Sequence, residues 1–377
     1  MKRILVVGDF IKGSGVTQFI VSTFINLDQT KYKIDVMAYD RDATVKAKIQ
    51  SLGWQYHSVT PLHQNPVRFL LDWHSFLKRR AANYDIIHFN YSASWNYLPI
   101  VWAKKFTHAK IVVHSHNAYF GNHSNKLVMS FLLRLHNHGR YVISKYSDFQ
   151  FATSMDAAKW MFTADLVNAK RVKILRNGIN LDRFNYQPAI RDKIRTQFNL
   201  QHNFLIGFAG VLLSRKNPQF ALEVFYKVFQ KRPEAKLIIL GDGPLKQELM
   251  DRAKALGLTD VVIFKGIVDN IEEWYQAFDA LIFPSKVEGF GLVALEAQAT
   301  GLPILISENF PSIVSVTKLV HTNTLSAGAP SWADILLNLP AYKRHDQSEL
   351  LREANFSVTV TADKLNAYYT DLMRNSL

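Results

Sequence analysis

Two series of short apolar runs, separated by stretches long enough to form helices, restrict the folds open to this chain of 377 residues. The first series comprises Arg3–Val7, Ile34–Ala38, Ile86–Phe89, Lys110–Val113 and Phe149–Ala152. The second comprises Leu205–Ala209, Ala235–Leu240, Val261–Phe264, Ala280–Phe283 and Ile304–Ile306. Strands that alternate with helices are typical of parallel sheets with crossover helices. The sequence therefore predicts an α/β protein with two Rossmann-like, doubly wound domains.

The two series meet around residues 184–203, and this junction sets the expected domain limits. We expect an N-terminal domain over residues 1–185 and a C-terminal domain over residues 186–356. The last helix, at about residues 357–377, is expected to cross back to the first domain. Ligands of such sheets bind beyond the carboxyl ends of the strands, so we expect the two domains to face a central cleft.

Charge is distributed unevenly between the two halves of the chain. Residues 1–185 hold 25 Lys and Arg against 11 Asp and Glu, and residues 186–377 hold 20 of each, so the first half carries the whole net charge of +14. A one-sided basic domain indicates an anionic partner, either membrane lipid or a phosphate-bearing acceptor, although a solvated basic face explains the excess equally well. No nucleic-acid-binding module is recognisable, so nucleic acid is not an expected partner.

Composition and hydropathy bear on the compartment. The chain has no cysteine, which excludes disulfides and thiolate chemistry and fits a cytoplasmic protein. The opening apolar run ends at Asp9 and predicts a strand rather than a leader, and no stretch approaches the roughly 20 apolar residues of a spanning helix. The segment Asn125–Arg140 mixes leucines with cations, as do interfacial helices and core-facing crossover helices alike. Peripheral association with the inner face of the cell membrane therefore stays open.

The segment Ser285–Pro303 contains the most informative motif. Glu288 precedes a Gly289-Phe290-Gly291 turn, and Glu296 follows it within a short predicted helix. The glycines let backbone N–H groups approach a ligand, and the start of a helix favours phosphate. The carboxylates accept hydrogen bonds from sugar hydroxyls. A solvated role is common for glutamates, but Glu296 stands among apolar neighbours and needs partners, so the combination predicts a nucleotide-sugar pocket.

Three further candidates follow predicted strands. The backbone of the turn that contains Gly15 is suited to approach a phosphate or a sugar. His116, or less favourably His114, follows an apolar strand, where functional side chains of this architecture lie. Arg215 and Lys216 are placed to neutralise a diphosphate leaving group. Each candidate also has a purely structural alternative. The turn at Gly15 can be an ordinary tight turn, the histidine can be a buried core residue, and Arg215 and Lys216 can form a solvated basic turn.

Two motifs suggest metal binding, but neither is complete. Asp40-Arg41-Asp42 resembles a metal-binding Asp-x-Asp pair, yet it ends the second predicted strand, where acidic residues are common. The pairs His114-x-His116 and His136-x-His138 have no further ligands at suitable spacing. We therefore expect no metal site.

The chain resembles the retaining glycosyltransferases of the GT-B fold, family 4, especially those of bacterial exopolysaccharide and capsule assembly. The resemblance extends over most of the chain. Its motifs are Glu288-x7-Glu296 with the residues up to Pro303, His114–Asn117, Phe151–Ser154 with Ala157 and Ala158, Asn177–Ile179, and Gly241–Pro244.

The resemblance implies roles for the residues of the main motif. Glu288 would contact the hydroxyls of the donor sugar and support the transition state. Glu296 would hold the ribose hydroxyls, and the backbone of Gly289-Phe290-Gly291 would line the sugar and the diphosphate. Two residues outside the motif are also implied. Lys216 would bind phosphate, and His116 would lie near the reacting sugar.

One position departs from the family pattern. Val211 stands where the family usually has arginine, directly after the glycine that ends the strand. Arg215, beside Lys216, is the candidate that would supply the missing charge.

The resemblance also implies a reaction. The C-terminal domain would bind a nucleotide-sugar, most simply a UDP-sugar, and the N-terminal domain a glycan, lipid-linked or protein acceptor. Transfer would retain anomeric configuration, pass through an oxocarbenium-like transition state and need neither a metal nor another cofactor. Two alternatives remain: a weakly active accessory protein that binds an acceptor or stabilises a partner enzyme, and a nucleotide-sugar epimerase.

Overall fold

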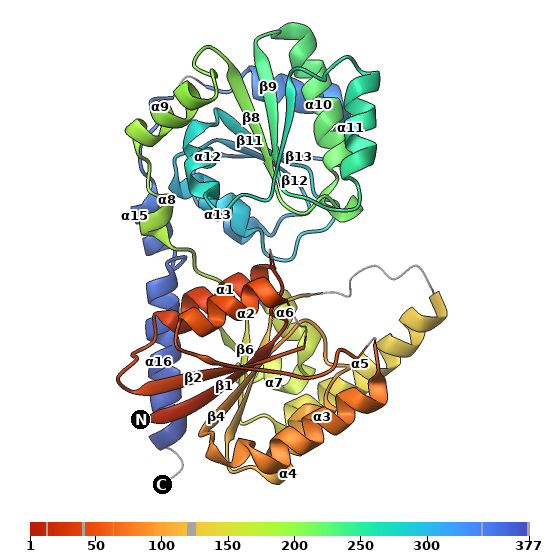
Figure 1. Cartoon of the computed structure of the whole chain (residues 1–377), viewed down its shortest axis with the longest axis vertical. Helices are drawn as coiled ribbons and strands as arrows, with labels where there is room; N and C mark the ends of the chain where they lie inside the picture. The colour runs from red at the N-terminus through yellow and green to blue at the C-terminus, as the bar shows by residue number, and fades with distance from the viewer. Residues whose placement is uncertain (13, 40–41, 63, 119–125, 341, 375–377) are drawn as a thin grey trace. The chain divides into compact units, whose positions relative to one another are not determined.

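The first half of the chain forms one parallel sheet in the computed structural model, which describes all residues except 13, 40–41, 63, 119–125, 341 and 375–377 (Figure 1). Its described strands lie in the order β3-β2-β1-β4-β5-β6-β7. Their bounds are β1 (Lys2–Gly8), β2 (Tyr32–Ala38), β3 (Gln55–Ser58), β4 (Ile86–Tyr91), β5 (Lys110–Ser115), β6 (Phe149–Ala152) and β7 (Lys173–Ile174). The central strands are buried on both faces, which explains their continuous apolar sequences.

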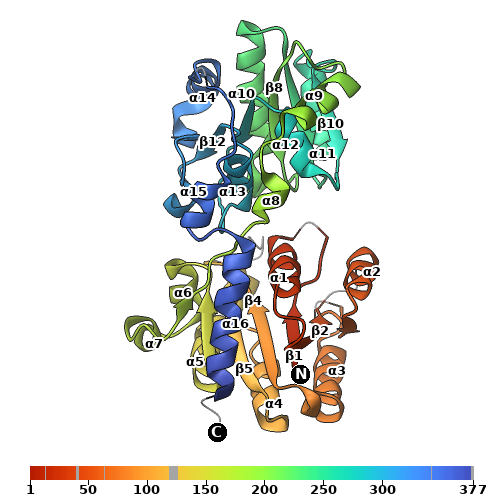
Figure 2. The ribbon, with the colours of Figure 1, turned by 90° about the vertical axis from the view of Figure 1, so that its left-hand side faces the viewer.

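Helices cover both faces of this sheet. The described helices are α1 (Gly15–Ile25), α2 (Ala43–Ser51), α3 (Pro66–Arg79), α4 (Leu98–Phe106), α5 (Lys126–Tyr146), α6 (Met155–Met161), α7 (Ala164–Asn168) and α16 (Val358–Arg374). One core lies between the sheet and helices α3 to α6, and the other between the sheet and helices α1, α2 and α16. Figure 2 shows α16, the last helix, running along this sheet.

The second half forms another parallel sheet, whose described strands lie in the order β10-β9-β8-β11-β12-β13. The strands are β8 (Phe204–Ala209), β9 (Ala235–Leu240), β10 (Val262–Gly266), β11 (Ala280–Phe283), β12 (Ile304–Ser307) and β13 (Val320–Asn323). Helices α10 (Pro218–Lys231), α11 (Lys246–Ala255) and α14 (Gly328–Leu337) pack on one face. On the other face lie α8 (Leu181–Phe184), α9 (Pro188–Gln197), α12 (Ile271–Ala277), α13 (Leu292–Ala299) and α15 (Ser348–Glu353).

The fold has the predicted class, with two doubly wound α/β units. The first unit contains Met1–Gly178 and Val358–Leu377, and the second contains Ile179–Ser357. Residues 179–185, which the sequence analysis gives to the first domain, thus belong to the second unit. Helices α8 and α9, at the start of this unit, pack into the core of the second sheet.

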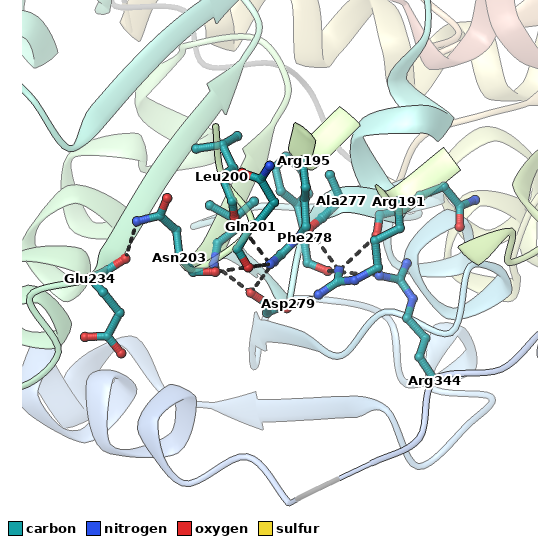
Figure 3. Close-up of polar contacts among 12 residues, drawn as sticks. Arg191, Arg195, Leu200, Gln201, Asn203, Glu234, Ala277, Phe278, Asp279 and Arg344 are labelled. Carbon is teal, nitrogen blue, oxygen red and sulfur yellow. Dashed lines mark hydrogen bonds and ion pairs between the residues drawn. The ribbon is translucent and has the colours of Figure 1, made fainter. Parts of the chain in front are cut away.

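A cluster of arginines fastens several segments of the second unit together (Figure 3). Asp279 accepts hydrogen bonds from Arg191 at 2.5 Å and from Arg195 at 2.6 Å. The same two arginines and Arg344 donate to backbone carbonyls at the C-terminal end of α12. Cations are favoured there because the last carbonyls of a helix have no partners within the helix. Burial of Arg344 lowers its pKa to about 9.

Helix α5 follows the segment 119–125, so only part of the predicted helix Asn125–Arg140 lies within the described residues. Ile143 joins the core of the first unit, as expected of a crossover helix. Within the described ranges, no helix combines the length and the apolar character needed to cross a membrane.

Three buried histidines lie together in the first unit. His88 on β4 packs against His114 on β5 with ring centroids 5.6 Å apart, and His114 packs against His116 at 4.3 Å. His88 Nδ1 lies 2.5 Å from the hydroxyl of Tyr369, which links the cluster to α16. Burial lowers the pKa of both His88 and His116 to about 3, and it lowers the pKa of His114 well below its ordinary value. All three side chains are therefore neutral in the folded protein near pH 7.

This cluster predicts loss of stability in acid. An exposed, unfolded imidazole has a pKa near 6.5, so the unfolded chain takes up protons that the folded chain excludes. The stabilisation is complete above about pH 6.5 and falls by up to about 1.4 kcal/mol per pH unit for each histidine as the pH drops towards 3. We expect the free energy of unfolding of His114→Phe to fall less between pH 7 and pH 5 than that of the wild type, as measured by urea unfolding followed by circular dichroism. The exposed His108 provides the control His108→Gln; an unchanged slope in His114→Phe would contradict this account.

Candidate functional site

The candidate site of the second unit lies where its sheet changes direction. The chain builds outward from β8 through β9 to β10, then returns to the other side of β8 with β11. Loops that follow β8 and β11 therefore turn to opposite faces of the sheet, which leaves a crevice at the carboxyl edge between two adjacent strands. Lys216 follows β8 and Glu288 follows β11, so the two predicted residues lie on the two loops at this switch point.

The loop after β8 is held by close backbone packing. Leu212 N–H donates to the carbonyl of Asp242 at 3.0 Å, and Gly210 N–H donates to that of Leu240 at 2.8 Å. A Cβ on Gly241 would lie 1.9 Å from the carbonyl oxygen of Gly210, so only glycine permits this approach. The Gly241–Pro244 motif thus serves to position the loop that ends at Lys216.

Lys216 and Glu288 form a buried ion pair. The Nζ atom of Lys216 contacts Oε2 of Glu288, and both side chains are about nine-tenths buried. Lys216 Nζ also lies 4.9 Å from the ring centroid of Phe283, and Ser285 Oγ donates to Glu288 at 3.4 Å. Burial lowers the pKa of Lys216, and the facing Glu288 carboxylate partly offsets that effect. A cation and a carboxylate are therefore held together with little water around them.

The start of α13 adds backbone donors to the site. Gly291 is its N-cap residue, with φ of +87°, and its first turn has neither a side-chain cap nor an acidic residue. Phe290 lies in the core against Phe356, so this residue presents its backbone and not its ring to the site. The positive end of the helix and its first N–H groups thus remain suited to an anion.

Glu296 is buried within α13, as its apolar neighbours suggest. It is only 6% exposed, and the hydroxyl of Tyr275 donates to its Oε2 atom at 3.4 Å. Gln298, on the same helix, accepts hydrogen bonds from the N–H groups of Val316 and Thr317. These contacts fix the orientation of α13 and hold the Glu296 carboxylate in a defined place.

Arg215 and Val211 lie on the loop after β8. Arg215 belongs to the 3-10 turn Ser214–Lys216, and its carbonyl accepts from Lys286 N–H at 2.8 Å. Among the residues that the structure describes, its guanidinium has no ion pair or hydrogen bond, so this charge is open to a ligand. Val211 is partly exposed and supplies no charge.

Gly15 and His116 belong to the first unit, whose sheet also changes direction between its first and fourth strands. Gly15 is the first residue of α1, the helix that follows β1. His116 follows β5 and lies 2.9 Å from Oδ1 of Asn90 through its Nε2 atom. Its Nδ1 atom is buried and has no hydrogen-bond partner in the described part of the chain. Both residues therefore lie at the carboxyl edge of the first sheet.

The structure thus brings together the predicted residues of the second unit. Lys216 and Glu288 touch, Gly289-Phe290-Gly291 joins Glu288 to α13, and Glu296 lies on that helix. Sequence reasoning missed Ser285, Tyr275 and Asn90, which contact the predicted carboxylates and histidine. A polar residue at the end of an apolar strand is the signal that could have found Ser285 and Asn90.

The last residue of the Asp40-Arg41-Asp42 motif has a structural contact in the first unit. Asp42 caps α2 by accepting from the N–H groups of Thr44 and Val45, while Asp40 and Arg41 lie outside the described residues, as does Gly13. Over the described part of the chain, no three His, Cys, Asp or Glu side chains are grouped to hold a metal ion.

Comparisons with known proteins identify the class. Residues 13–183 match the family model "Glycosyltransferase Family 4", and residues 190–335 match "Glycosyl transferases group 1". Together with the two parallel-sheet units, these matches show that the chain is a glycosyltransferase of the GT-B type, similar to group 1 and family 4.

Curated relatives agree with this class. EpsF of Bacillus subtilis, a protein named only provisionally as a glycosyltransferase, is 26% identical over 361 residues, which cover 93% of this chain and 91% of EpsF. The D-inositol 3-phosphate glycosyltransferase of Streptomyces scabiei is 37% identical over 148 residues, which cover 36% of this chain and 33% of that enzyme.

Solved structures share the fold. The structure of HepE of Anabaena in complex with UDP and glucose superposes on this chain with a TM-score of 0.78 at 17% sequence identity. The superposition covers 98% of this chain and 100% of the HepE chain. Sucrose-phosphate synthase of Thermosynechococcus elongatus gives a TM-score of 0.74 at 17% identity, with 100% of each chain covered.

The geometry at Gly291 predicts a specific sensitivity. The backbone of Gly291 is in the left-handed conformation, which side chains disfavour, and a Cβ at this position would lie 2.7 Å from ring atoms of Phe310. Gly257 has a similar φ of +69° with nothing within 4 Å, so Gly257→Ala measures the backbone strain alone, about 1–2 kcal/mol. Gly291→Ala should lower the free energy of unfolding by about 1–3 kcal/mol more than this control in urea titrations. Equal losses in the two variants would show that Phe310 does not constrain the turn.

Proposed function

We propose that the chain is a retaining, metal-independent glycosyltransferase that moves a sugar from a UDP-sugar to a glycan, lipid-linked or protein acceptor. The buried Lys216–Glu288 pair beside the uncapped start of α13 is the observation that carries the proposal. It combines a cation and backbone donors, which suit a diphosphate, with carboxylates, which suit hydroxyls. The HepE structures, which contain UDP or UDP-glucose, support a uridine-linked donor.

The donor's parts match different residues of this site. In the proposal, Lys216, Arg215 and the start of α13 hold the diphosphate, Glu288 holds the sugar hydroxyls, and Glu296 holds the ribose. Lys216 must then exchange part of its contact with Glu288 for contact with phosphate. This exchange frees an oxygen of Glu288 for the sugar while keeping both charges paired, which avoids leaving a buried charge alone.

The proposed reaction exchanges one bond at the anomeric carbon of the sugar for another. The bond between the sugar's anomeric carbon and the phosphate oxygen breaks, and the acceptor oxygen bonds to the same face of that carbon. The acceptor's proton passes to an oxygen of the departing diphosphate. Charge grows on the diphosphate as the bond breaks, and the cations and helix start stabilise it in place of a metal ion. In this proposal, Gly15 lines the donor with its backbone, and His116 acts beside the reacting sugar.

A biological setting follows from the relatives' names. EpsF and the lipopolysaccharide core mannosyltransferase LpsB of Rhizobium meliloti, 27% identical over 215 residues, support a role in a bacterial polysaccharide such as an exopolysaccharide or capsule, or in a glycoconjugate. We place the protein in the cytoplasm, where such donors are made, at the inner face of the cell membrane.

Substitution of Glu288 and of Glu296 should have different effects on the affinities for UDP and for a UDP-sugar. Glu296→Gln should weaken both to a similar extent, roughly tenfold to a hundredfold, because it loses charge-assisted bonds to the ribose. Glu288→Gln should weaken the UDP-sugar more than UDP, because only the former carries the sugar. Calorimetry with UDP and the best-binding UDP-sugar of a panel measures this.

The exposed Glu248 provides the control Glu248→Gln, which should bind both ligands as the wild type does. Tyr275→Phe removes the hydroxyl that contacts Glu296 while keeping the carboxylate, and it should cost less than Glu296→Gln. If Glu296→Gln binds UDP like the wild type, the ribose assignment is wrong.

Turnover distinguishes the proposed enzyme from its alternatives. With an acceptor and a UDP-sugar, we expect a glycoside whose anomeric proton coupling in NMR matches that of the donor, and we expect the same rate after treatment with a chelator. Inverted product, or activity that is lost with chelator and restored by magnesium or manganese, would contradict the proposal. A changed free donor without acceptor indicates an epimerase. Donor binding without turnover indicates an accessory protein, the outcome that Val211 favours.

A further inference from the structure

The C-terminal ends of α12 and α13 are joined by the side chain of Arg344. Its Nη2 atom donates to the carbonyl of Tyr275 at 2.7 Å, and its Nη1 atom donates to those of Gln276 and Phe278, each at 2.9 Å. These three residues belong to the last turn and the C-cap of α12. The Nε atom of Arg344 donates at 2.7 Å to the carbonyl of Thr300, the C-cap of α13. One planar guanidinium group therefore links the ends of two helices.

The two helices that Arg344 links carry the two partners of a contact in the candidate site. Tyr275 lies on α12 and Glu296 on α13, and the buried hydroxyl of Tyr275 donates to Oε2 of Glu296 at 3.4 Å. Arg344 bonds the backbone of Tyr275 directly. It also bonds Thr300, whose own N–H donates to the carbonyl of Glu296 at 3.2 Å. A shift between the two helix ends would therefore move the Glu296 carboxylate relative to Tyr275.

The segment that carries Arg344 packs closely on the end of α13. Gly301 follows this helix with a φ of +62°, and a Cβ there would lie 2.2 Å from the carbonyl oxygen of His345. The N–H of Gln347 donates to the carbonyl of Ala299, the last residue of α13, at 3.4 Å. The backbone on both sides of the Arg344 side chain is thus held against α13, so the guanidinium group has a defined position.

A neighbouring arginine separates the link to α13 from the capping of α12. Arg191 donates to the carbonyls of Gln276 and Phe278, as Arg344 does, and it pairs with Asp279 (Figure 3). In the described part of the chain, the hydrogen bonds of Arg191 end on α12 and on the residues between it and β11. Both arginines therefore favour the C-terminal end of α12, and Arg344 adds the link to α13.

We propose that Arg344 is a positioning residue for the donor, which sets the Glu296 carboxylate where it receives the ribose hydroxyls. The inference rests on the proposed function, in which Glu296 holds the ribose. Arg344 acts through the two helices and does not touch the donor itself. Lysine keeps the charge, but its single ammonium group cannot span the carbonyls at both helix ends as the planar guanidinium does. A displaced carboxylate loses bonds to the ribose, because hydrogen bonds weaken steeply outside a narrow range of distance and angle.

A pair of ligands with and without the ribose hydroxyls tests this role. Calorimetry compares UDP with dideoxyuridine diphosphate, the analogue that lacks both hydroxyls. The wild type should bind UDP more tightly by roughly tenfold or more, because its carboxylate bonds the hydroxyls. Arg344→Lys should reduce this preference about threefold or more by weakening the binding of UDP. In a Glu296→Gln background the same substitution should change the preference little, because its effect passes through that carboxylate.

Two further variants distinguish positioning from a general loss of stability. Arg191→Lys is the matched control: it loses bonds at the same end of α12, and it should keep the wild-type preference for UDP. Gly301→Ala displaces the carbonyl of His345 from α13, so it should reduce the preference as Arg344→Lys does. Gly257→Ala has a similar backbone conformation, with nothing within 4 Å of the added Cβ, and should keep the preference.

The outcomes separate this inference from the proposed function. A wild type that binds both ligands equally would contradict the ribose assignment of Glu296 and the role of Arg344 with it. A wild type that prefers UDP, with the full preference kept in folded Arg344→Lys and Gly301→Ala, would overturn the role of Arg344 alone. An equal loss of preference in Arg191→Lys would overturn it too. Circular dichroism verifies folding, and if Arg344→Lys is unfolded, the comparison of Gly301→Ala with Gly257→Ala decides.

Discussion

The direction in which each sheet grows is the constraint on which the rest of the structure depends. Both sheets begin at an inner strand, extend to one side for two strands, and then return to the other side. Consecutive loops at the return point lead to helices on opposite faces, so they separate and leave the carboxyl edge open. Gly15 in the first unit and Lys216 and Glu288 in the second, which the sequence singles out, follow the strands at these two points, and Asn90, which it does not, lies near the end of β4. The strand order therefore determines where the candidate functional residues lie in each unit.

Within the second unit, a buried ion pair makes this edge a specific site. Removing Lys216 and Glu288 from water is costly, and neither charge would be tolerated there without the other. The pair forms only if the loops after β8 and β11 keep their positions relative to each other. The hydrogen bond from Lys286 N–H to the Arg215 carbonyl joins the two loops, and the close backbone contact at Gly241 positions the loop after β8. A diphosphate beside Lys216 can replace part of this pairing at little electrostatic cost. The same contact therefore keeps the two buried charges paired and suits the site to an anion.

The sequence predicted the inner strands and one edge strand, β10, but missed the edge strands β3, β7 and β13. Phe149–Ala152, Ala235–Leu240 and Ala280–Phe283 have the predicted bounds because strands buried on both faces are continuous apolar runs. β3 and β13 were not predicted, because Gln55–Ser58 and Val320–Asn323 lie at the edges of their sheets and carry polar residues. The burial of Glu296 was also foreseeable from its neighbours. The contact between Lys216 and Glu288 was not, because 72 positions separate them and only the adjacency of β8 and β11 joins their loops.

The central claim is that the switch point of the second sheet is the donor site, and a crystal structure of this chain grown with UDP tests it most directly. The account predicts the diphosphate at the start of α13 within hydrogen-bond distance of Lys216, and the ribose hydroxyls on the Glu296 carboxylate. Lys216 should have moved from its contact with Glu288 towards the phosphate. UDP bound at another place, with the Lys216–Glu288 pair unchanged, would contradict the account.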